Sequence, residues 1–305
     1  MKIAIQTAGP EERYGTDAAY RMIAELGFDG VDANIDLLVS RADIREKRIP
    51  QALLTESEKE IRSLVRPWGA AAEKYGIDNY QAQAPFPCFI NDPEYNDVIL
   101  KMIDNSIIAA DEIGCRNLIV HPFYLGYNEH LNPECEWEIN IERYSRLIPT
   151  AKKYGVTVCL ENMFVANRGK IYAACCSDIN TACAYVDELN RIAGQRVFGF
   201  CLDTGHALLC GLDIRDAMVK LGDRISAFHV HDNNGLNDQH LAPYMGVMDW
   251  NRFVQGLSEI PFNATMSFET FNVWNVVDNE VAPEIMKFIA SCGRMFARRA
   301  GKDET

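Results

Sequence analysis

Three of the six histidines of this 305-residue sequence lie in one short segment, AFHVHDNNGLNDQHLAP, at residues 227–243. The segment contains His229, His231 and His240 together with Asp232 and Asp238. Imidazoles and carboxylates bind divalent metals, and they also move protons near neutral pH. The composition of the segment therefore indicates either a chemically active site or a polar loop, and the rest of the sequence has to distinguish them.

Ionisable residues also stand near the ends of other strand-like segments. In the last four apolar runs, side chains alternate between a bulky apolar face and a small or polar face, which is the period of a β-strand. In each run the small or polar face reaches an ionisable residue near its C-terminal end. These four residues are Glu161, Asp203, His229 and Glu269.

The fold that must position them is predicted from short apolar runs that alternate with longer amphipathic segments. The apolar runs cover residues 2–7, 30–35, 79–84, 117–122, 156–162, 197–203, 225–231 and 264–270. Several amphipathic segments end in glycine, as helices do. Eight such units predict an α/β protein with a single (β/α)8 TIM barrel over residues 1–305. The main alternative is an open doubly wound sheet, but TAGPEERYG after the first run lacks the G-x-G-x-x-G loop of that fold.

In such a barrel, the C-terminal ends of the strands meet at one mouth, where active sites lie. The four residues would then converge, and three carboxylates without a cation would repel one another. A divalent metal removes that repulsion. An oxygen-rich set with one imidazole favours Mn²⁺, and Mg²⁺, Co²⁺ or Zn²⁺ would also suit it. The sequence therefore predicts one metal ion bound by Glu161, Asp203, His229 and Glu269.

The composition restricts the class of protein. A net charge of −13 repels, on average, the phosphate backbone of nucleic acids and anionic lipid surfaces. The sequence has no run of 18 apolar residues and no signal-peptide pattern. Its ten cysteines are scattered and form no C-x-x-C motif, which indicates reduced thiols. We therefore expect a cytoplasmic protein that binds neither nucleic acid nor membrane.

The motifs at these strand ends resemble those of the xylose isomerase-like barrel superfamily. They are LEN at 160–162, LDTGH at 202–206, HVHD at 229–232, DQH at 238–240 and FET at 268–270. The superfamily includes sugar and sugar-phosphate isomerases and epimerases, inosose dehydratase, and DNA-repair enzymes of the endonuclease IV type. The resemblance covers nearly the whole chain and implies the same barrel, but it does not single out one activity.

The resemblance also implies roles for individual residues. The metal ligands of the epimerases match Glu161, Asp203, His229 and Glu269. His206 matches a residue that contacts substrate oxygens. In the repair enzymes, the histidine corresponding to His206 and a D-x-H pair, here Asp238 and His240, help to bind additional zinc ions. Because relatives are often dimers or tetramers, the resemblance implies a homo-oligomer as well.

The third strand departs from the pattern of the repair enzymes. They use histidines after both the third and the fourth strand, whereas this chain has Gln83 and His121 there. A neutral amide is a poor zinc ligand, so a full trinuclear zinc site is not expected. Together with the negative net charge, this departure argues against cleavage of DNA.

A metal flanked by carboxylates suits proton transfer next to a carbonyl group, because the cation stabilises the resulting cis-enediolate. The expected substrate is a small sugar or a related polyol ketone. Glu161 and Glu269 are the predicted pair that removes the proton and returns it. Contact with the substrate is predicted for His206, His121, Asp238 and His240. Orientation of the metal ligands is predicted for His231 and Asn162.

Three other interpretations stay open. A dehydratase of the inosose dehydratase type would use the same metal and expel a hydroxyl group. A metal-dependent nuclease would cleave DNA, and a non-catalytic module would only bind sugar. Arg168 and Lys170, after the fifth strand, could hold a phosphate or carboxylate, but a solvated loop is the simpler interpretation. His130 has no supporting context and is expected at the surface.

Overall fold

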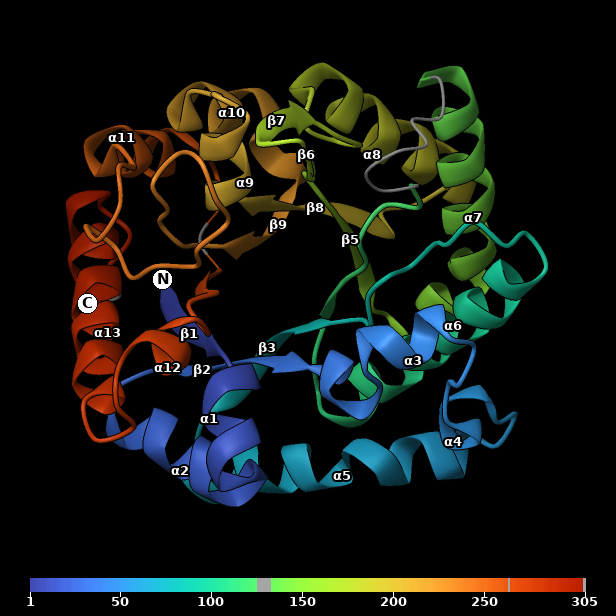
Figure 1. The fold of residues 1–305 in the computed structure, drawn as a ribbon, viewed down its shortest axis with the longest axis horizontal. Coiled ribbons are helices and arrows are strands. Elements are labelled where there is room, and N and C mark those ends of the chain that lie inside the picture. Colours follow the sequence, from blue (N-terminus) through green and yellow to red (C-terminus); the bar gives the residue numbers. More distant parts are fainter. Residues whose placement is uncertain (125–132, 263, 304–305) are drawn as a thin grey trace.

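The computed structural model describes residues 1–124, 133–262 and 264–303, and its centre is a ring of eight parallel strands (Figure 1). In spatial order the strands are β10 (Thr265–Phe268), β1 (Lys2–Gln6), β2 (Gly30–Asn34), β3 (Asp78–Gln83), β4 (Asn117–Ile119), β5 (Thr157–Glu161), β8 (Phe198–Asp203) and β9 (Ile225–His229). The ring is nearly closed, because Val230, directly after β9, forms a parallel bridge with Phe268 of β10. The predicted TIM barrel and all eight of its strands are therefore confirmed.

Long helices surround this ring on the outside (Figure 1). They are α2 (Thr16–Glu25), α5 (Glu58–Tyr75), α6 (Tyr95–Glu112), α7 (Pro133–Tyr154), α8 (Ile179–Ala193), α10 (Ile214–Leu221), α11 (Trp250–Glu259) and α13 (Ala282–Arg299). Their ends carry the expected signals. At the start of α5, the Ser57 hydroxyl accepts a hydrogen bond from the Glu60 amide, and at its end Gly76 adopts φ 67°, which glycine allows without a steric cost.

Shorter elements connect the strands to these helices. Those that follow the C-terminal ends of strands are α1 (Ala8–Tyr14), η1 (Ile35–Leu38), α3 (Arg41–Arg45), α4 (Gln51–Leu54), the hairpin of β6 (Phe164–Asn167) and β7 (Lys170–Ala173), α9 (Thr204–Leu209) and α12 (Val273–Val276). A further short turn, η2 (Gly222–Arg224), precedes β9. The elements that follow the strand ends surround the mouth of the barrel, where functional loops are found in this fold.

The β6–β7 hairpin corrects an expectation, because the sequence suggested a solvated loop there. Arg168 and Gly169 form a two-residue turn with φ of 50° and 75°, and Asn167 pairs with Lys170 across it. Positive φ at both turn positions is typical of the tightest hairpins. Arginine is an unusual residue for this conformation, so the sequence lacks the usual residues of a two-residue hairpin turn. Arg168 and Lys170 are exposed at the tip of the hairpin.

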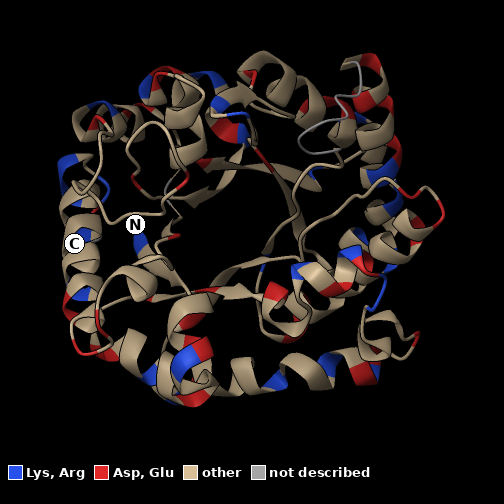
Figure 2. Cartoon of the chain, viewed as in Figure 1, with Lys and Arg blue, Asp and Glu red and all other residues tan. Residues whose placement is uncertain are grey.

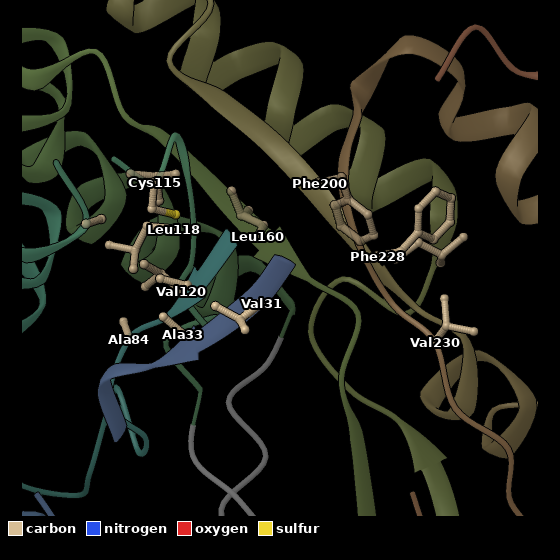
Figure 3. Close-up of a cluster of buried hydrophobic side chains, with 14 of the residues drawn as sticks. Val31, Ala33, Ala84, Cys115, Leu118, Val120, Leu160, Phe200, Phe228 and Val230 are labelled. Carbon is tan, nitrogen blue, oxygen red and sulfur yellow. The ribbon is translucent and has the colours of Figure 1, made fainter. Parts of the chain in front are cut away.

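Two sets of buried side chains follow from the alternation along the strands. Residues such as Leu160, Phe200 and Phe228 belong to the large apolar core, part of which is shown in Figure 3. Residues of the opposite faces, namely Ile119, Cys159, Cys201 and Ala227, form a separate small cluster. Apolar side chains of β4, β5, β8 and β9 thus fill part of the barrel interior, and ionisable groups lie at the ends of β5, β8 and β9.

All ten cysteines are free. None of the described helices combines the length and the apolar character that crossing a membrane requires. His130, expected at the surface, lies outside the residues that the structure describes.

Candidate metal centre at the barrel mouth

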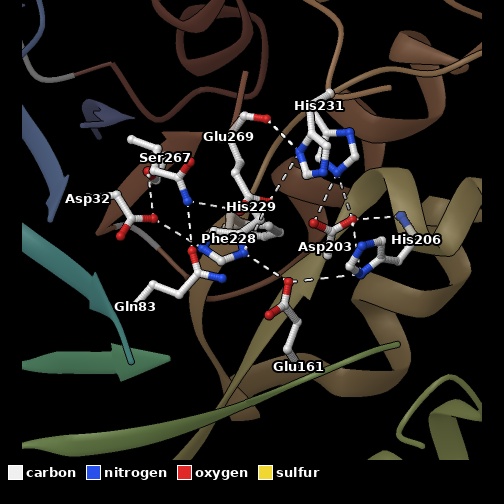
Figure 4. Close-up of polar contacts among 12 residues, drawn as sticks. Asp32, Gln83, Glu161, Asp203, His206, Phe228, His229, His231, Ser267 and Glu269 are labelled. Carbon is white, nitrogen blue, oxygen red and sulfur yellow. Dashed lines mark hydrogen bonds and ion pairs between the residues drawn. The ribbon is translucent and has the colours of Figure 1, made fainter. Parts of the chain in front are cut away.

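Four side chains from consecutive strands of the ring converge at the mouth. Glu161 and Asp203 end β5 and β8, His229 ends β9, and Glu269 directly follows β10. One ligand atom of each lies within 4.8 Å of the ligand atoms of the other three, and all four residues are buried (Figure 4). The convergence that the strand periodicity predicted is therefore present in the structure.

The chemistry of this cluster fits a divalent cation. Among the described residues, the ion pairs of Glu161 are with imidazoles only, and no lysine or arginine reaches it. Its Oε2 is buried and accepts no hydrogen bond within the described part of the chain. Burial works to raise the pKa of Glu161, but the imidazole of His229 outweighs it and holds the pKa below its usual value. An ionised, incompletely paired carboxylate of this kind is a suitable metal ligand.

His229 is oriented by Asp32, a residue that the sequence analysis did not identify. The Nε2 atom of His229 lies 3.0 Å from Asp32 Oδ2, and its Nδ1 atom lies 2.9 Å from Glu161 Oε1. Asp32 is held in turn by the Gln81 amide, whose Nε2 donates to Oδ2 at 2.8 Å. A carboxylate on the far nitrogen of a ligand histidine fixes the ring and its tautomer. Here the arrangement leaves Nδ1 facing the carboxylate cluster.

A chain of amides connects the two candidate acid–base residues. Gln6 Nε2 donates to Glu269 Oε1 at 2.9 Å and to Gln83 Oε1 at 2.7 Å. Gln83 Nε2 lies 3.3 Å from His121 Nε2, which is 3.2 Å from Glu161 Oε2. Burial is the main cause that raises the pKa of Glu269, from 4.5 to about 7. Glu269 and Glu161 therefore sit in one network with pKa values shifted in opposite directions.

Asp203 has contacts on two sides. One oxygen caps helix α9, because Oδ1 accepts the His206 amide at 2.6 Å, and both oxygens lie 3.1 Å from His231 Nε2. His231 thus contacts a predicted ligand in the way an orienting residue does. Burial opposes ionisation of Asp203, but the imidazoles of His206 and His231 lower its pKa well below the usual range. Asp203 is therefore ionised and rigidly placed.

Asn162 ties two of the ligand strands together. Its Nδ2 donates to the Asp203 carbonyl oxygen, and its Oδ1 accepts the Asp203 amide, both at 2.9 Å. The side chain therefore contacts the backbone of Asp203 rather than the carboxylate of Glu161, for which the sequence suggested an orienting role. The pair of bonds holds the end of β5 at a fixed distance from the end of β8.

A second group of ionisable residues forms the rim above Asp203. Asp238 Oδ2 lies 2.9 Å from His240 Nε2 and 3.6 Å from His206 Nε2. The rings of His240 and His231 stack with centroids 4.1 Å apart. Burial opposes protonation of His206, but Asp203 and Asp238 outweigh it and raise its pKa well above the usual value. His231, His240 and Glu269 also have ligand atoms within 4.8 Å of one another and could hold a metal ion.

A cavity of about 950 Å³ opens above these groups. All residues predicted to contact substrate or to move its proton line it: His121, Glu161, His206, Asp238, His240 and Glu269. The remaining residues of the predicted site, namely Asn162, Asp203, His229 and His231, are buried and are not part of its lining. The residues predicted to contact substrate therefore line the cavity, whereas Asp203 and His229, predicted as metal ligands, do not.

Comparison with protein families gives one match over most of the chain. The family model described as xylose isomerase-like TIM barrel matches residues 20–292.

Several curated proteins are similar in sequence. An uncharacterized protein of Methanocaldococcus jannaschii is 26% identical over 268 residues, which cover 79% of this chain and 87% of that protein. Fructoselysine 3-epimerase of Shigella flexneri is 21% identical over 282 residues, which cover 90% of this chain and 91% of the epimerase. A probable endonuclease 4 of Thermoplasma acidophilum is 29% identical over 174 residues, or 52% of this chain and 54% of that relative. The last match therefore spans only about half of each protein.

Solved structures support the fold over the whole chain. A D-tagatose 3-epimerase-like protein has a TM-score of 0.68 and 21% identity, covering 96% of this chain and 99% of that one. The IolI protein with a bound zinc atom has a TM-score of 0.70 and 16% identity, covering 98% and 99%. At these identities the likeness establishes the barrel fold.

Proposed function

Since this chain belongs to the family of xylose isomerase-like TIM barrels, we propose that it is a metal-dependent enzyme that isomerises or epimerises a sugar or sugar phosphate. The convergence of Glu161, Asp203, His229 and Glu269 beside the cavity is the observation that carries this proposal. The similar proteins that are named as sugar epimerases, matched over most of this chain, support it. An isomerase of this type transfers a proton between two carbons or between two faces of one carbon.

Glu161, Asp203, His229 and Glu269 would hold the cation, with Mn²⁺ as the proposed metal. A divalent cation bound there would polarise the carbonyl and neighbouring hydroxyl oxygens of a ketose, which acidifies the adjacent carbon-bound proton. The zinc atom of the IolI structure supports metal binding in this fold but not a choice of metal. Proton transfer and orientation of the substrate would be carried out by side chains that line the cavity.

Glu161 and Glu269 divide the proton transfer between them in this proposal. Glu161, whose pKa is held low, removes the proton from the carbon next to the carbonyl group. Glu269, which is ionised when it binds the cation, would take up a proton from solvent and return it to the substrate carbon. Return to the opposite face gives an epimer, and return to the neighbouring carbon gives an isomer. Both residues line the cavity from strands that are separated around the ring.

The other lining residues bind and orient the substrate. His206 presents Nε2 toward Asp238 because its Nδ1 is fixed 2.8 Å from the Asn162 carbonyl oxygen. His121 has a pKa lowered to about 4 by burial, so its ring is neutral at physiological pH. A neutral imidazole can contact a hydroxyl group as donor or acceptor without adding charge to the site. These contacts suit the vicinal hydroxyls of a sugar.

We also propose that residues 1–305 work as one domain, in the cytoplasm. The free state of all ten cysteines supports a reducing compartment. A homo-oligomer is a further proposal that stands on the resemblance alone.

The test is solvent exchange. The Mn²⁺-loaded protein is incubated with a panel of ketoses in heavy water, and the products are followed by NMR. We expect deuterium at a carbon next to the carbonyl group, with the composition of the sugar unchanged. Glu161→Gln and Glu269→Gln should each lower the rate about 10²- to 10⁴-fold. The matched control Glu188→Gln, a partly exposed residue paired with Arg191 outside the cavity lining, should not lower it. Loss of water would indicate a dehydratase, and exchange that survives both cavity variants would contradict the proposal.

A nuclease is the second candidate, favoured by the similarity to a probable endonuclease 4 and by the grouping of His206, Asp238 and His240. Gln83 weakens this candidate, because its amide lies where a zinc-binding nuclease would need a histidine. Nicking of DNA that contains an abasic site, at catalytic protein concentrations and dependent on His240, would favour it over the isomerase.

A further inference from the structure

The outer wall of the cavity carries a group of cations that the proposed chemistry does not use. Arg41 and Arg45 of α3 line the cavity together with Lys47, which follows that helix. The spacing of four residues places the two arginines on the same face of the helix. Figure 2 shows Lys and Arg residues on α3, at the inner edge of the ring of helices. All three cations share the cavity with Glu161 and Glu269.

The cations differ in how far their charge is already compensated. Lys47 forms a close ion pair with Asp92, which also lines the cavity. Arg41 is only loosely paired, because its Nε lies 3.9 Å from Asp36 Oδ2. Arg45 takes part in no ion pair or hydrogen bond with the described residues. The outer wall is therefore locally positive, in a protein whose net charge is −13.

Phe86 lies between Arg41 and His121. The Arg41 guanidinium lies 5.2 Å from the centre of the Phe86 ring, and that ring lies 4.8 Å from the His121 ring. The Phe86 amide donates to Asp36 Oδ1 at 2.9 Å, which holds the aromatic residue in place. His121 is itself 3.2 Å from Glu161. Two rings, those of Phe86 and His121, therefore separate the Arg41 guanidinium from Glu161.

The cations of the β6–β7 hairpin do not face the cavity as Arg41 and Arg45 do. Arg168 and Lys170 are exposed at the tip of the β6–β7 hairpin and are not part of the cavity lining. The same hairpin contributes Phe164, Val165 and Ala166 to the lining, which are neutral. An anion inside the cavity would therefore meet Arg41 and Arg45 and not the hairpin cations. The guanidinium fork of arginine matches the oxygens of phosphate and carboxylate groups.

We propose that Arg41 and Arg45 bind an anionic group, a phosphate or a carboxylate, at the end of the substrate that is distant from the metal centre. The inference rests on the proposed function, because it assumes that a ketose occupies the cavity with its reacting carbons beside Glu161 and Glu269. It narrows the substrate class from sugars in general to sugars with one terminal negative charge. In this arrangement Phe86 forms the wall along which the carbon chain lies.

The test compares three ligands of one carbon skeleton on the Mn²⁺-loaded protein: D-fructose, D-fructose 6-phosphate and D-fructuronate. Calorimetric titration measures binding, and inorganic phosphate serves as a fourth probe without a sugar. We expect at least one anionic ketose to bind about tenfold or more tightly than fructose, with the preference weakening at high salt. The phosphate and carboxylate ligands distinguish the two sources of charge.

Two variants localise the effect. Arg41→Gln and Arg45→Gln should reduce the preference for the anionic over the neutral ketose about 10- to 100-fold each. Arg48→Gln is the matched control, because Arg48 is in the same segment but pairs with Asp43 and does not line the cavity. The inference is overturned if no anionic probe binds more tightly than fructose, or if the preference is unchanged in both variants. Preferential binding without deuterium exchange would instead contradict the proposed function and leave the anion site supported.

Discussion

Asp32 and His229 are 197 positions apart in the sequence and meet inside the barrel, with Asp32 Oδ2 3.0 Å from His229 Nε2. The contact joins β2 to β9, two strands that are not neighbours in the ring. It determines which nitrogen of His229 faces the metal centre. The residue that orients the proposed ligand His229 therefore lies in the first quarter of the chain, where no motif was found in the sequence.

Replacing Asp32 by asparagine should weaken metal binding without removing a ligand. An amide offers only one, uncharged acceptor oxygen to Nε2–H and stabilises the tautomer that leaves Nδ1 free less well, so we expect the affinity for Mn²⁺ to fall about 10- to 100-fold. Equilibrium titration with Mn²⁺, followed by electron paramagnetic resonance, measures the change. Asp17→Asn is the control, because Asp17 is exposed and paired with Lys74 on the outer surface. Equal affinities for Asp32→Asn and the control would show that the contact has no orienting role.

Removal of a ligand should abolish the stabilisation that the metal provides. A ligand that binds only the folded state raises the free energy of unfolding by about 2.7 kcal/mol at a concentration 100 times its Kd. We expect the wild-type protein to gain a corresponding increase in Tm with Mn²⁺, whereas His229→Asn gains none at the same concentration. Differential scanning calorimetry with and without Mn²⁺ measures both. An undiminished gain in His229→Asn would exclude this residue as a ligand.

Metal binding should depend on pH because protons compete with the cation. Without metal, Glu269 has a pKa of about 7, raised by burial. Burial works to lower the pKa of His229, but Cys201, Glu269 and Glu161 outweigh it and raise that pKa above its usual value. Both groups must lose a proton to bind a cation, so the affinity for Mn²⁺ should rise at least about tenfold per pH unit below pH 7. Titrations at pH 5.5 to 8 test this. Glu269→Gln should make the slope shallower.

The same pKa shifts predict the stability of the metal-free protein. Both groups hold protons more tightly in the folded than in the unfolded state, so their contribution to stability is fully present below the unfolded pKa values. It is lost as the pH rises through the folded values. The Tm of the metal-free protein should therefore fall between pH 5 and pH 8, relative to the metal-loaded protein. A Tm that increases over this range would contradict the assignment.

Asp232 should be important for stability rather than for chemistry. It is buried, and its oxygens accept hydrogen bonds from the amides of Gly246 and Met248 and from the Trp250 indole. Asp232→Asn leaves some of these donors without an acceptor, which costs about 1–3 kcal/mol of unfolding free energy for each. Urea denaturation measures the loss. Asp249→Asn, at the exposed start of α11, is a control in which only a helix cap is weakened.

The strands and the four convergent residues could be predicted because one physical rule fixes both. A strand that faces packed helices on one side and the barrel axis on the other alternates between bulky apolar and small or polar side chains. Glu161, Asp203, His229 and Glu269 belong to the small or polar faces and stand at the strand ends. Asp32 could not be predicted in this way. In GVDANI, the alternation does not show whether the aspartate ends a strand at a functional site or lies within a turn.

The cations of the outer wall were not predictable for a different reason. Arg41 and Arg45 lie in a five-residue helix whose sequence, RADIR, is that of an ordinary exposed helix. Only the tertiary arrangement places this helix against the cavity and Phe86 beneath Arg41. The sequence instead allows Arg168 and Lys170 to bind an anion, although it favours a solvated loop there. The tight turn of the hairpin carries them away from the cavity.

The most direct test is a crystal of the protein grown with Mn²⁺ and measured at a wavelength where manganese scatters anomalously. Our account predicts a strong anomalous peak enclosed by the carboxylates of Glu161, Asp203 and Glu269 and by Nδ1 of His229. A map without such a peak at saturating Mn²⁺, or with its only peak elsewhere, for example between Asp238 and His240, would contradict it.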